Sequence, residues 1–427
     1  LHLSLRRQRQ MCIRDRSSGE RMPVLVDTRV GMPLFNPTVY ALTQLRGRNL
    51  AANTIVQALR HIMVFILFLE QRGIDLDARL QKGHIVDLAE IESLVRTCYL
   101  RLADMGVDEG AKATPAGLVS LERIRRGFAR QAAPAIDPDS VGNRVRRIAD
   151  YLSWMASAYL LRLPFGNPAL SALESSRQQV IGALRARAPS SGGRTVLDAR
   201  EGLSPEVSAR LLEVTARNSL ENPWAGEFTK LRNELIFRWM YSFGLRRGEL
   251  LNVKVSDVNF RKETVVIIRR ADAPEDPRQE QPTVKTRDRL LPMAPDLCRL
   301  THDYVIHARS RLKGARKHEY LFVADKTGAP MSLSTLNKCF AFLRTKIREL
   351  PDDFSPHVLR HTWNDNFSAA MDRLDIPAAE EQKMRSFLMG WSETSDSAQN
   401  YTRRHVREKA KKVSLHLQAD MAGKVDL

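Results

Sequence analysis

The chain has little of what several protein classes require. No metal-ligand spacing occurs among its four cysteines, and isolated thiols of this kind predict a reducing cytoplasm rather than a disulfide framework. These cysteines are Cys12, Cys98, Cys298 and Cys339. The longest apolar run, Ile62 to Leu69, is too short to cross a bilayer, and no apolar signal-peptide core follows the basic N-terminus. We therefore expect a cytoplasmic protein with no membrane partner.

Two other patterns are missing. No cluster of carboxylates suggests a Mg²⁺ site, which disfavours a metal-dependent nuclease. No βαβ repeat and no nucleotide fingerprint is found either. We therefore expect no metal and no cofactor.

Basic residues are in clear excess. The chain has 67 Lys and Arg against 49 Asp and Glu, a formal net charge of +18. Such an excess indicates a polyanionic partner, and nucleic acid is the first candidate. A generally basic surface that binds nothing in particular is the alternative, and charge alone does not choose between DNA and RNA.

The length of 427 residues allows two or three domains. Residues 1–21 are basic without an apolar period, and we expect a disordered tail or a non-native start there. Residues 22–168 are predicted to be helical, with helices over Thr54–Arg72 and Val141–Leu161 and a basic helix or turn over Glu122–Arg130. On the second of these helices, Arg144 and Arg147 are predicted to face water.

The segment 169–202 is predicted to be a linker, because a short helix is followed by the Ser- and Gly-rich stretch APSSGGRTV. A second domain is predicted over 203–413, opening at the N-cap Ser204, and 414–427 form a C-terminal tail. Its predicted elements are helices at Glu227–Phe243, Asp296–Leu312, Ser334–Arg348, Ser355–Met371 and Ala379–Met389, strands at Thr264–Ile268 and Leu290–Met293, and an acidic, proline-rich loop at Ala271–Pro282.

The most informative stretch lies between Ser355 and Tyr401. Ser355-Pro356 should begin a helix on which His357 and Arg360, three residues apart, share one face. Free N–H groups at a helix start, together with these two side chains, suit an anionic oxygen. Trp391 and Tyr401 follow in the segments LMGW and NYTRRH.

Two upstream segments complete a set of candidate site residues. In FGLRRGE, Gly244 ends an apolar helix and Arg246 follows the turn. In VKTRDRLLPM, Lys285 begins a strand-like segment. Glu249 is predicted either to orient Arg246 or to pair with Lys254.

The chain resembles the tyrosine recombinase family, also called phage-type integrases, in the order of these residues along the sequence: Arg246, Lys285, His357-x-x-Arg360, Trp391 and Tyr401. The resemblance covers about Ser204 to Val413. It implies a mainly α fold with a small β-sheet, in which a helical core-binding domain that clamps DNA precedes a mixed α+β catalytic domain of the DNA breaking-rejoining type. Trp391 stands where most of the family has His.

The resemblance also implies the chemistry. Tyr401 would be the nucleophile that forms a 3′-phosphotyrosine, and Arg246 and Arg360 would bind the phosphoryl oxygens. Lys285 would protonate the departing 5′ oxygen, and Trp391 would donate its indole N–H. His357 would either hydrogen-bond the phosphate or assist deprotonation of the tyrosine. Tyr401 is preferred over Tyr304 and Tyr320 because it alone follows both His357 and Trp391 in the chain.

The predicted function is site-specific recombination of double-stranded DNA, for integration or excision of a mobile element. The expected acting unit is a tetramer on DNA in the nucleoid, with accessory DNA-bending or directionality proteins as further partners. A topoisomerase IB-like or telomere-resolving strand transferase shares the same residues, and a non-catalytic DNA-binding protein that retains the fold is the alternative from another class. The basic segment after Tyr401 either is a solvated helix face or, as the resemblance implies for the C-terminal helix, leads to a contact between subunits made by Val413, Leu415 and Leu417.

Overall fold

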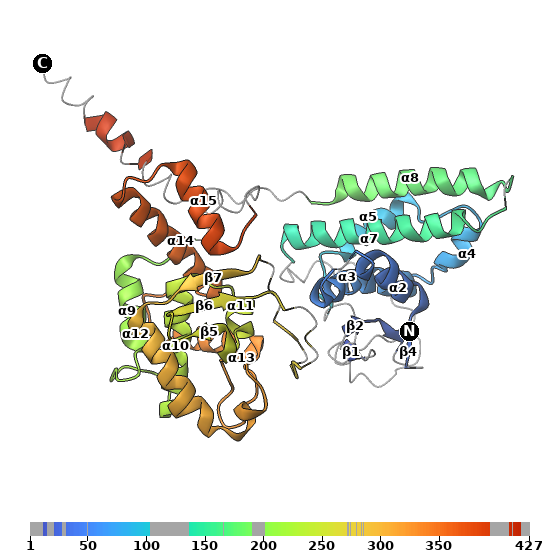
Figure 1. Ribbon diagram of the computed structural model, residues 1–427. Coiled ribbons are helices and arrows are strands. Elements are labelled where there is room, and N and C mark those ends of the chain that lie inside the picture. The colour runs from blue at the N-terminus through green and yellow to red at the C-terminus, as the bar shows by residue number, and fades with distance from the viewer. Residues whose placement is uncertain are drawn as a thin grey trace, which may run out of the picture. The chain divides into compact units, whose positions relative to one another are not determined.

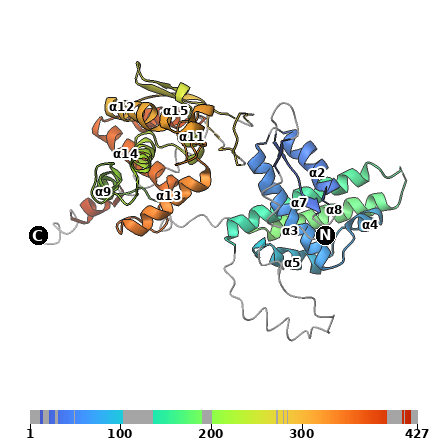
Figure 2. The ribbon, with the colours of Figure 1, turned by 90° about the horizontal axis from the view of Figure 1, so that it is seen from below.

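The computed structural model divides the chain into two compact units, Leu1–Leu197 and Asp198–Leu427 (Figures 1 and 2). It describes residues 12–14, 21–27, 31–48, 50–102, 136–164, 166–189, 201–270, 273, 275–278, 280–282, 284, 286–392, 410–411 and 413–419. The division falls within the region in which a linker is predicted.

Helices dominate the first unit. They are α2 (Phe35–Tyr40), the π-helix η1 (Ala41–Arg46), α3 (Ala52–Gln71), α4 (Leu76–Gln81), α5 (Leu88–Thr97), α7 (Pro138–Leu160) and α8 (Ala169–Arg187). Among the described residues of this unit, four short strands form two antiparallel pairs: β1 (Cys12–Arg14) with β2 (Arg21–Pro23), and β3 (Val26–Asp27) with β4 (Met32–Pro33). The core is one cluster of apolar side chains drawn from α3, α5, α7 and α8.

Helix α3 is long and apolar enough to span a membrane by length and composition alone, and half of the relevant window is buried in the structure. Its buried side chains, among them Ile55, Ile62 and Phe65, belong to the core cluster of the first unit. Because α3 supplies this core and packs against α7, we assign it as a core helix.

Three expectations for this part of the chain are wrong. The linker cannot begin at 169, because α8 runs beside α7 (Figure 1) and buries Leu173 and Leu184 in the core. Arg144 does not face water: it is 7% exposed and donates to the carbonyls of Cys98 and Leu100 at 2.9 and 2.8 Å. Cys12–Arg14 is a strand that pairs with β2, so of the two alternatives predicted for residues 1–21, a disordered tail or a non-native start, the first is wrong for these three residues.

The second unit places a small sheet among helices, as predicted. The sheet has the order β5-β6-β7 (Val258–Asn259, Thr264–Ile267 and Arg289–Pro292), all antiparallel, with Val265 opposite Leu291. The helices are α9 (Pro205–Thr215), α10 (Glu227–Phe243), α11 (Arg247–Asn252), α12 (Pro295–Asp303), α13 (Leu333–Lys346), α14 (Pro356–Arg373) and α15 (Ala378–Met389), with shorter turns η4 (Val255–Asp257), η5 (Tyr304–Ala308), η6 (Arg309–Arg311) and η7 (Lys313–Lys317). The mainly α fold with small antiparallel sheets is thereby confirmed.

A large apolar core joins most of these elements, and Met389, Trp391 and Trp363 form a small separate cluster. Helix α10 lies at its centre, where Trp239 and Phe237 are fully buried, and it packs against α9, α12 and α14. The predicted N-cap Ser204 accepts a hydrogen bond from the Val207 N–H at 3.3 Å. These contacts fix α10, which leads into the turn before Arg246, and α14, which carries Arg360.

Candidate active site

The turn between α10 and α11 positions Arg246. α10 ends at Phe243, and Gly244 follows with a left-handed backbone (φ 58°), its N–H donating to the Met240 carbonyl at 3.0 Å. A Cβ at this position would lie 2.9 Å from the Trp363 ring, so the backbone and the packing both require glycine. The chain thereby turns sharply, and Arg246 occupies the N-cap of α11.

A buried carboxylate, that of Glu249, lies at the centre of the site and has no exposed surface. Arg246 donates to it twice, from its backbone N–H at 3.0 Å and from Nη1 at 3.2 Å. Thr286 Oγ1 and Arg289 Nη2 donate to it at 2.8 and 2.9 Å. Arg360 Nη1 forms an ion pair with it at 3.7 Å. One carboxylate thus joins three arginines, from the start of α11, from β7 and from α14.

Glu249 remains ionised because of this cationic surrounding. Burial acts to raise its pKa, but the charges of Arg289 and Arg360 outweigh burial and hold the pKa of Glu249 at about 2. Lys254, the alternative partner considered from the sequence, instead bonds to Glu275 at 2.8 Å. The hypothesis that Glu249 pairs with Lys254 is therefore wrong, and Glu249 contacts Arg246.

Helix α14 carries two more of the predicted site residues, His357 and Arg360. Arg360 is fully buried, and its Nη1 donates to the Gly244 carbonyl at 2.7 Å. This bond ties α14 directly to the turn that precedes Arg246. His357, one helical turn earlier, is exposed, and its ring centre lies 4.8 Å from that of His361.

Trp391 is held at the far end of α15. This helix ends at Gly390, whose left-handed backbone (φ 65°) again requires glycine, because a Cβ would lie 2.7 Å from the Arg287 carbonyl. The Gly390 carbonyl in turn accepts from the Arg287 N–H at 2.9 Å. Trp391 is 7% exposed, and its ring centre lies 5.3 Å from Arg360 Cζ. This distance suits a cation–π contact.

The structure therefore brings together three of the six predicted site residues, Arg246, Arg360 and Trp391, and places His357 on the same helix as Arg360. Lys285 and Tyr401 lie outside the described residues. The basic segment Glu122–Arg130, predicted as a helix or turn, lies outside them too.

Reasoning from the sequence missed Thr286 and Arg289. Both are buried, and Arg289 Nη1 also donates to Thr286 Oγ1 at 3.1 Å. One feature of the sequence could have identified Arg289: it is an arginine at the start of a strand with apolar residues. A charge buried in such a strand is destabilising unless it has a partner. Its partner Glu249 lies too far away in the sequence to be inferred from spacing.

The two rival tyrosines are poorly placed as nucleophiles. Tyr304 and Tyr320 have no exposed surface, and burial raises the pKa of each to about 12.

Among the residues that the structure describes, no three His, Cys, Asp or Glu side chains gather as a metal site.

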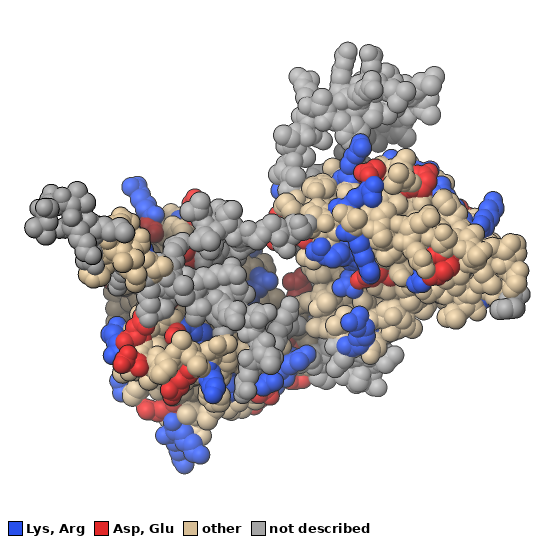
Figure 3. Space-filling view, turned by 90° about the horizontal axis from the view of Figure 1, so that it is seen from above, with Lys and Arg blue, Asp and Glu red and all other residues tan. Residues whose placement is uncertain are grey.

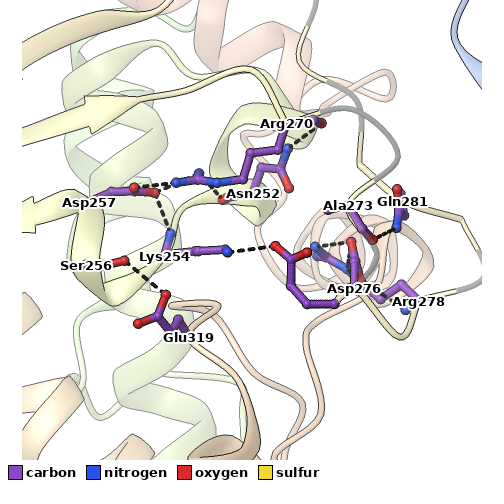
Figure 4. Close-up of polar contacts among 11 residues, drawn as sticks. Asn252, Lys254, Ser256, Asp257, Arg270, Ala273, Asp276, Arg278, Gln281 and Glu319 are labelled. Atoms are coloured by element: carbon purple, nitrogen blue, oxygen red, sulfur yellow. Dashed lines mark hydrogen bonds and ion pairs between the residues drawn. The ribbon is translucent and has the colours of Figure 1, made fainter. Parts of the chain in front are cut away.

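The acidic segment between β6 and β7 is anchored by buried ion pairs (Figure 4). Arg278, 7% exposed, binds both oxygens of Asp276 and donates from Nη1 to the carbonyls of Leu251 and Met331 at 2.9 and 3.1 Å. Its Cζ lies 4.3 Å from the ring centre of Tyr320. Because Leu251 is on α11, the segment that leads to Thr286 is tied to the helix that Arg246 begins.

Replacing Arg278 with methionine is expected to destabilise the second unit by about 3 kcal/mol or more, since the buried carboxylate of Asp276 would lose the guanidinium that binds it. Denaturant unfolding measures this loss. Lys254→Met breaks the half-exposed pair with Glu275 and should cost about 1 kcal/mol or less. An Arg278→Met/Asp276→Leu double variant should recover most of the loss; no recovery would contradict this account.

Comparison with known proteins shows what the chain is similar to. Residues 203–408 match the phage integrase family. This segment is a phage integrase domain. Curated relatives of the phage integrase domain include transposase A from transposon Tn554 of Staphylococcus aureus, 26% identical over 132 residues, which are 31% of this chain and 34% of the relative. Tyrosine recombinase XerD of Proteus mirabilis is 24% identical over 219 residues, 50% of this chain and 61% of the relative.

The chain thus spans about a third to three fifths of the length of the curated relatives that it matches. Among solved structures, the Tn1549 transposon integrase in complex with transposon right end DNA is 15% identical, with a TM-score of 0.45 over 88% of this chain and all of that one.

Proposed function

We propose that this protein is a site-specific DNA recombinase that cleaves and rejoins DNA through a 3′-phosphotyrosine and serves the integration or excision of a mobile element. The observation that carries the proposal is the convergence of Arg246 and Arg360 on one buried carboxylate, beside Trp391, within a phage integrase domain. Two guanidinium groups held in this way suit the non-bridging oxygens of a phosphodiester.

In the proposed reaction Tyr401 is the nucleophile. Its phenol gives up its proton, the phenolate oxygen attacks phosphorus, and the bond from phosphorus to the 5′ oxygen breaks. Lys285 donates a proton to that departing oxygen. Rejoining is the reverse: a 5′ hydroxyl attacks the phosphotyrosine and releases the phenol. The covalent intermediate conserves the bond energy, so the reaction requires no ATP.

The remaining roles belong to residues around the phosphate. Arg246 and Arg360 stabilise the charge that develops on the phosphoryl oxygens. Trp391 packs on Arg360 and supplies an indole N–H, which donates but does not transfer protons at neutral pH. His357 is exposed on the helix of Arg360, and in the proposal it either hydrogen-bonds the phosphate or assists Tyr401.

For the first unit we propose the role of a DNA clamp. Basic and acidic side chains are interspersed over the face shown in Figure 3, so total charge does not pick out the contact surface. A cavity of about 540 Å³ between α3 and α7 is a better candidate. It is lined by Thr54, Gln57, Ala58, His61, Ser140, Asn143, Arg146, Arg147 and Asp150.

The side chains of this cavity suit the edges of base pairs. Amides such as Gln57 and Asn143 can pair with adenine, and Arg146 and Arg147 with guanine or phosphate. Burial, with the nearby charges of Arg144 and Arg147, lowers the pKa of His61 to about 4. The imidazole is therefore neutral at pH 7 and offers both a donor and an acceptor.

Arg146→Ala tests this surface. Binding of the element's end DNA should weaken by about tenfold, and the slope of log K against log salt should fall by about 1 if the contact is to phosphate. Arg96→Ala, an exposed arginine on α5 outside the cavity, is the matched control and should bind as the wild type does. If Arg146→Ala and Arg96→Ala bound DNA equally well, the cavity would not be part of the DNA-binding surface.

The same proposal includes assembly on DNA as a tetramer, accessory DNA-bending or directionality proteins, and a location in the nucleoid.

Residues 413–419 are helical and exposed, and three apolar side chains on them, Val413, Leu415 and Leu417, are more than half exposed. Leu415→Asp should therefore leave binding of one protomer to DNA intact and abolish the higher complexes in a gel-shift titration. Ser414→Asp is the control for added charge. Normal assembly by Leu415→Asp would exclude this contact.

The proposed function is tested with a nicked suicide substrate cut from the element's own ends, in the presence of EDTA. The wild type should form a covalent protein–DNA adduct, and Tyr401→Phe should bind but form none. No adduct with the wild type would favour a non-catalytic DNA-binding protein. Cleavage and religation by single protomers, without pairing of two sites, would favour a topoisomerase IB-like or telomere-resolving enzyme.

A further inference from the structure

A cluster of polar side chains is buried between α14 and α15. It consists of Asn364 and Ser368 on α14 and of Glu381 and Arg385 on α15, and each of the four is less than 9% exposed. Arg385 has no exposed surface at all. An arginine in such a place requires a matching set of acceptors, because an isolated buried charge is strongly destabilising.

The acceptors come from both helices. Arg385 Nη2 donates to Ser368 Oγ at 2.6 Å and forms a very short ion pair with Glu381. Its Nη1 lies 3.2 Å from Asn364 Oδ1 and 3.4 Å from the Asn364 carbonyl. Ser368 Oγ also donates to Glu381 at 2.9 Å. The Arg385 guanidinium therefore bridges two turns of α14 and its own helix.

The same cluster continues into the active site. Asn364 Nδ2 donates to the carbonyl of Arg360 at 2.8 Å and lies 3.9 Å from Met389 Sδ at the end of α15. The backbone carbonyl of Ser386, the residue after Arg385, accepts a hydrogen bond from the backbone N–H of Trp391 at 2.9 Å. A short chain of contacts thus runs from Arg385 to the two residues whose side chains stack, Arg360 and Trp391.

We propose that Arg385, acting through Asn364, is a positioning residue that fixes the offset of α15 on α14 and thereby the placement of Trp391 over Arg360. The inference rests on the proposed recombinase function. Apolar side chains at these four positions would bury surface equally well, but they would tolerate several offsets between the helices. The directional bonds of a guanidinium to three fixed acceptors select one offset.

Positioning and plain stabilisation predict different results. Replacing a complete buried ionic cluster with apolar residues of similar volume is often neutral or stabilising. If Arg385 only stabilises the fold, an apolar replacement that keeps the melting temperature should keep activity as well. If it positions the site, activity should fall while stability and DNA binding are kept, because small misplacements of catalytic groups slow a reaction.

The test uses the full chain with Asn364→Ala, Ser368→Ala, Glu381→Leu and Arg385→Leu combined. We expect a melting temperature at or above that of the wild type, affinity for end DNA within about twofold, and single-turnover cleavage of the suicide substrate slowed about tenfold or more. In chain labelled with 5-fluorotryptophan, the ¹⁹F resonance of Trp391, assigned by its loss in Trp391→Phe, should shift or broaden.

The matched control is Arg309→Leu. Arg309 is another buried arginine of the same unit, 7% exposed, and among the contacts described it donates to the carbonyls of Tyr320 and His318, which lie outside α14 and α15. Its loss should lower the melting temperature and leave both the cleavage rate of the folded protein and the Trp391 resonance unchanged. Arg309→Leu therefore shows the effect of losing a buried arginine in general, and the combined variant shows the effect of losing Arg385 and its cluster.

Wild-type cleavage and an unchanged Trp391 resonance in the folded combined variant would overturn the inference. Should that variant fail to fold, Asn364→Ala alone decides. It removes the contacts of the Asn364 side chain with Arg360, Met389 and Arg385 Nη1, and it leaves Arg385 bound to Ser368 and Glu381. Normal cleavage and an unchanged resonance then overturn the inference, and slowed cleavage with normal binding supports it. Absence of cleavage in the wild type would count against the proposed function, whereas the ¹⁹F signature would still report on positioning.

Discussion

Glu249→Gln is expected to destabilise the second unit by about 3–5 kcal/mol at pH 7, because it leaves buried arginines without their shared counter-charge. Arg289 and Arg360 are 1% and 0% exposed at their side chains, so water cannot replace the carboxylate. Glutamine keeps the size of the side chain and one acceptor for Thr286. The decrease in the free energy of unfolding therefore comes from the missing negative charge and not from a cavity. Chemical denaturation at pH 7 measures it.

The pH dependence of stability should identify the same group. The pKa of Glu249 is about 2 in the folded protein against an ordinary value of 4.5. A carboxyl whose pKa is lowered by folding stabilises the fold above its unfolded pKa, and this contribution is lost as the pH falls through the folded pKa. The free energy of unfolding of the wild type should thus fall by about 3 kcal/mol between pH 4.5 and pH 2, and that of Glu249→Gln should lack this decrease.

Glu275→Gln is the control for the Glu249 experiment. Glu275 also pairs with a basic residue, Lys254, but its side chain is about half exposed. Its replacement should change stability by about 1 kcal/mol or less. If Glu249→Gln were as stable as Glu275→Gln, Glu249 could not be the group that organises the arginines.

Arg360→Lys is expected to bind DNA like the wild type and to lose cleavage by a factor of about a hundred to a thousand. Lysine keeps the positive charge opposite Glu249 and can donate to the Gly244 carbonyl as Arg360 does. It cannot, however, present a planar fork that binds one group with one nitrogen and phosphate with another. The fold should therefore survive while stabilisation of the transition state is lost.

Arg246→Lys should behave in the same way, because Arg246 bonds Glu249 through Nη1 and its side chain is about a third exposed toward solvent. Arg373→Lys, on the exposed last turn of α14, is the control and should cleave at the wild-type rate. Single-turnover cleavage at saturating DNA separates binding from chemistry. Wild-type cleavage by Arg360→Lys would remove the role assigned to this residue.

Local patterns predicted the elements that carry the site. The apolar period and the Ser355-Pro356 start placed α14 to within two residues at each end, and the β-branched run placed β6. The left-handed turn at Gly244 was also readable, because glycine after an apolar helix has few other uses. These features depend on neighbours in the sequence, so a single sequence is enough to find them.

Pairings between distant residues were not readable in this way. Arg144 was predicted to face water from its place on a helix, but its partners are carbonyls more than forty residues earlier. Helix α8 was underestimated because its Ser- and Ala-rich sequence has a weak apolar face, although it buries Leu173 and Leu184. The bond between Arg289 and Glu249 likewise joins segments that only the folded chain brings together.

The proposed reaction is tested most directly by identifying the amino acid that becomes linked to DNA. The adduct from the suicide substrate is digested with protease and nuclease, and the residual nucleotide-bearing peptide is sequenced by mass spectrometry. The account predicts a single peptide modified at Tyr401 through a 3′ phosphate. Modification of Tyr304 or Tyr320, linkage through a 5′ phosphate, or an adduct that persists in Tyr401→Phe would contradict it.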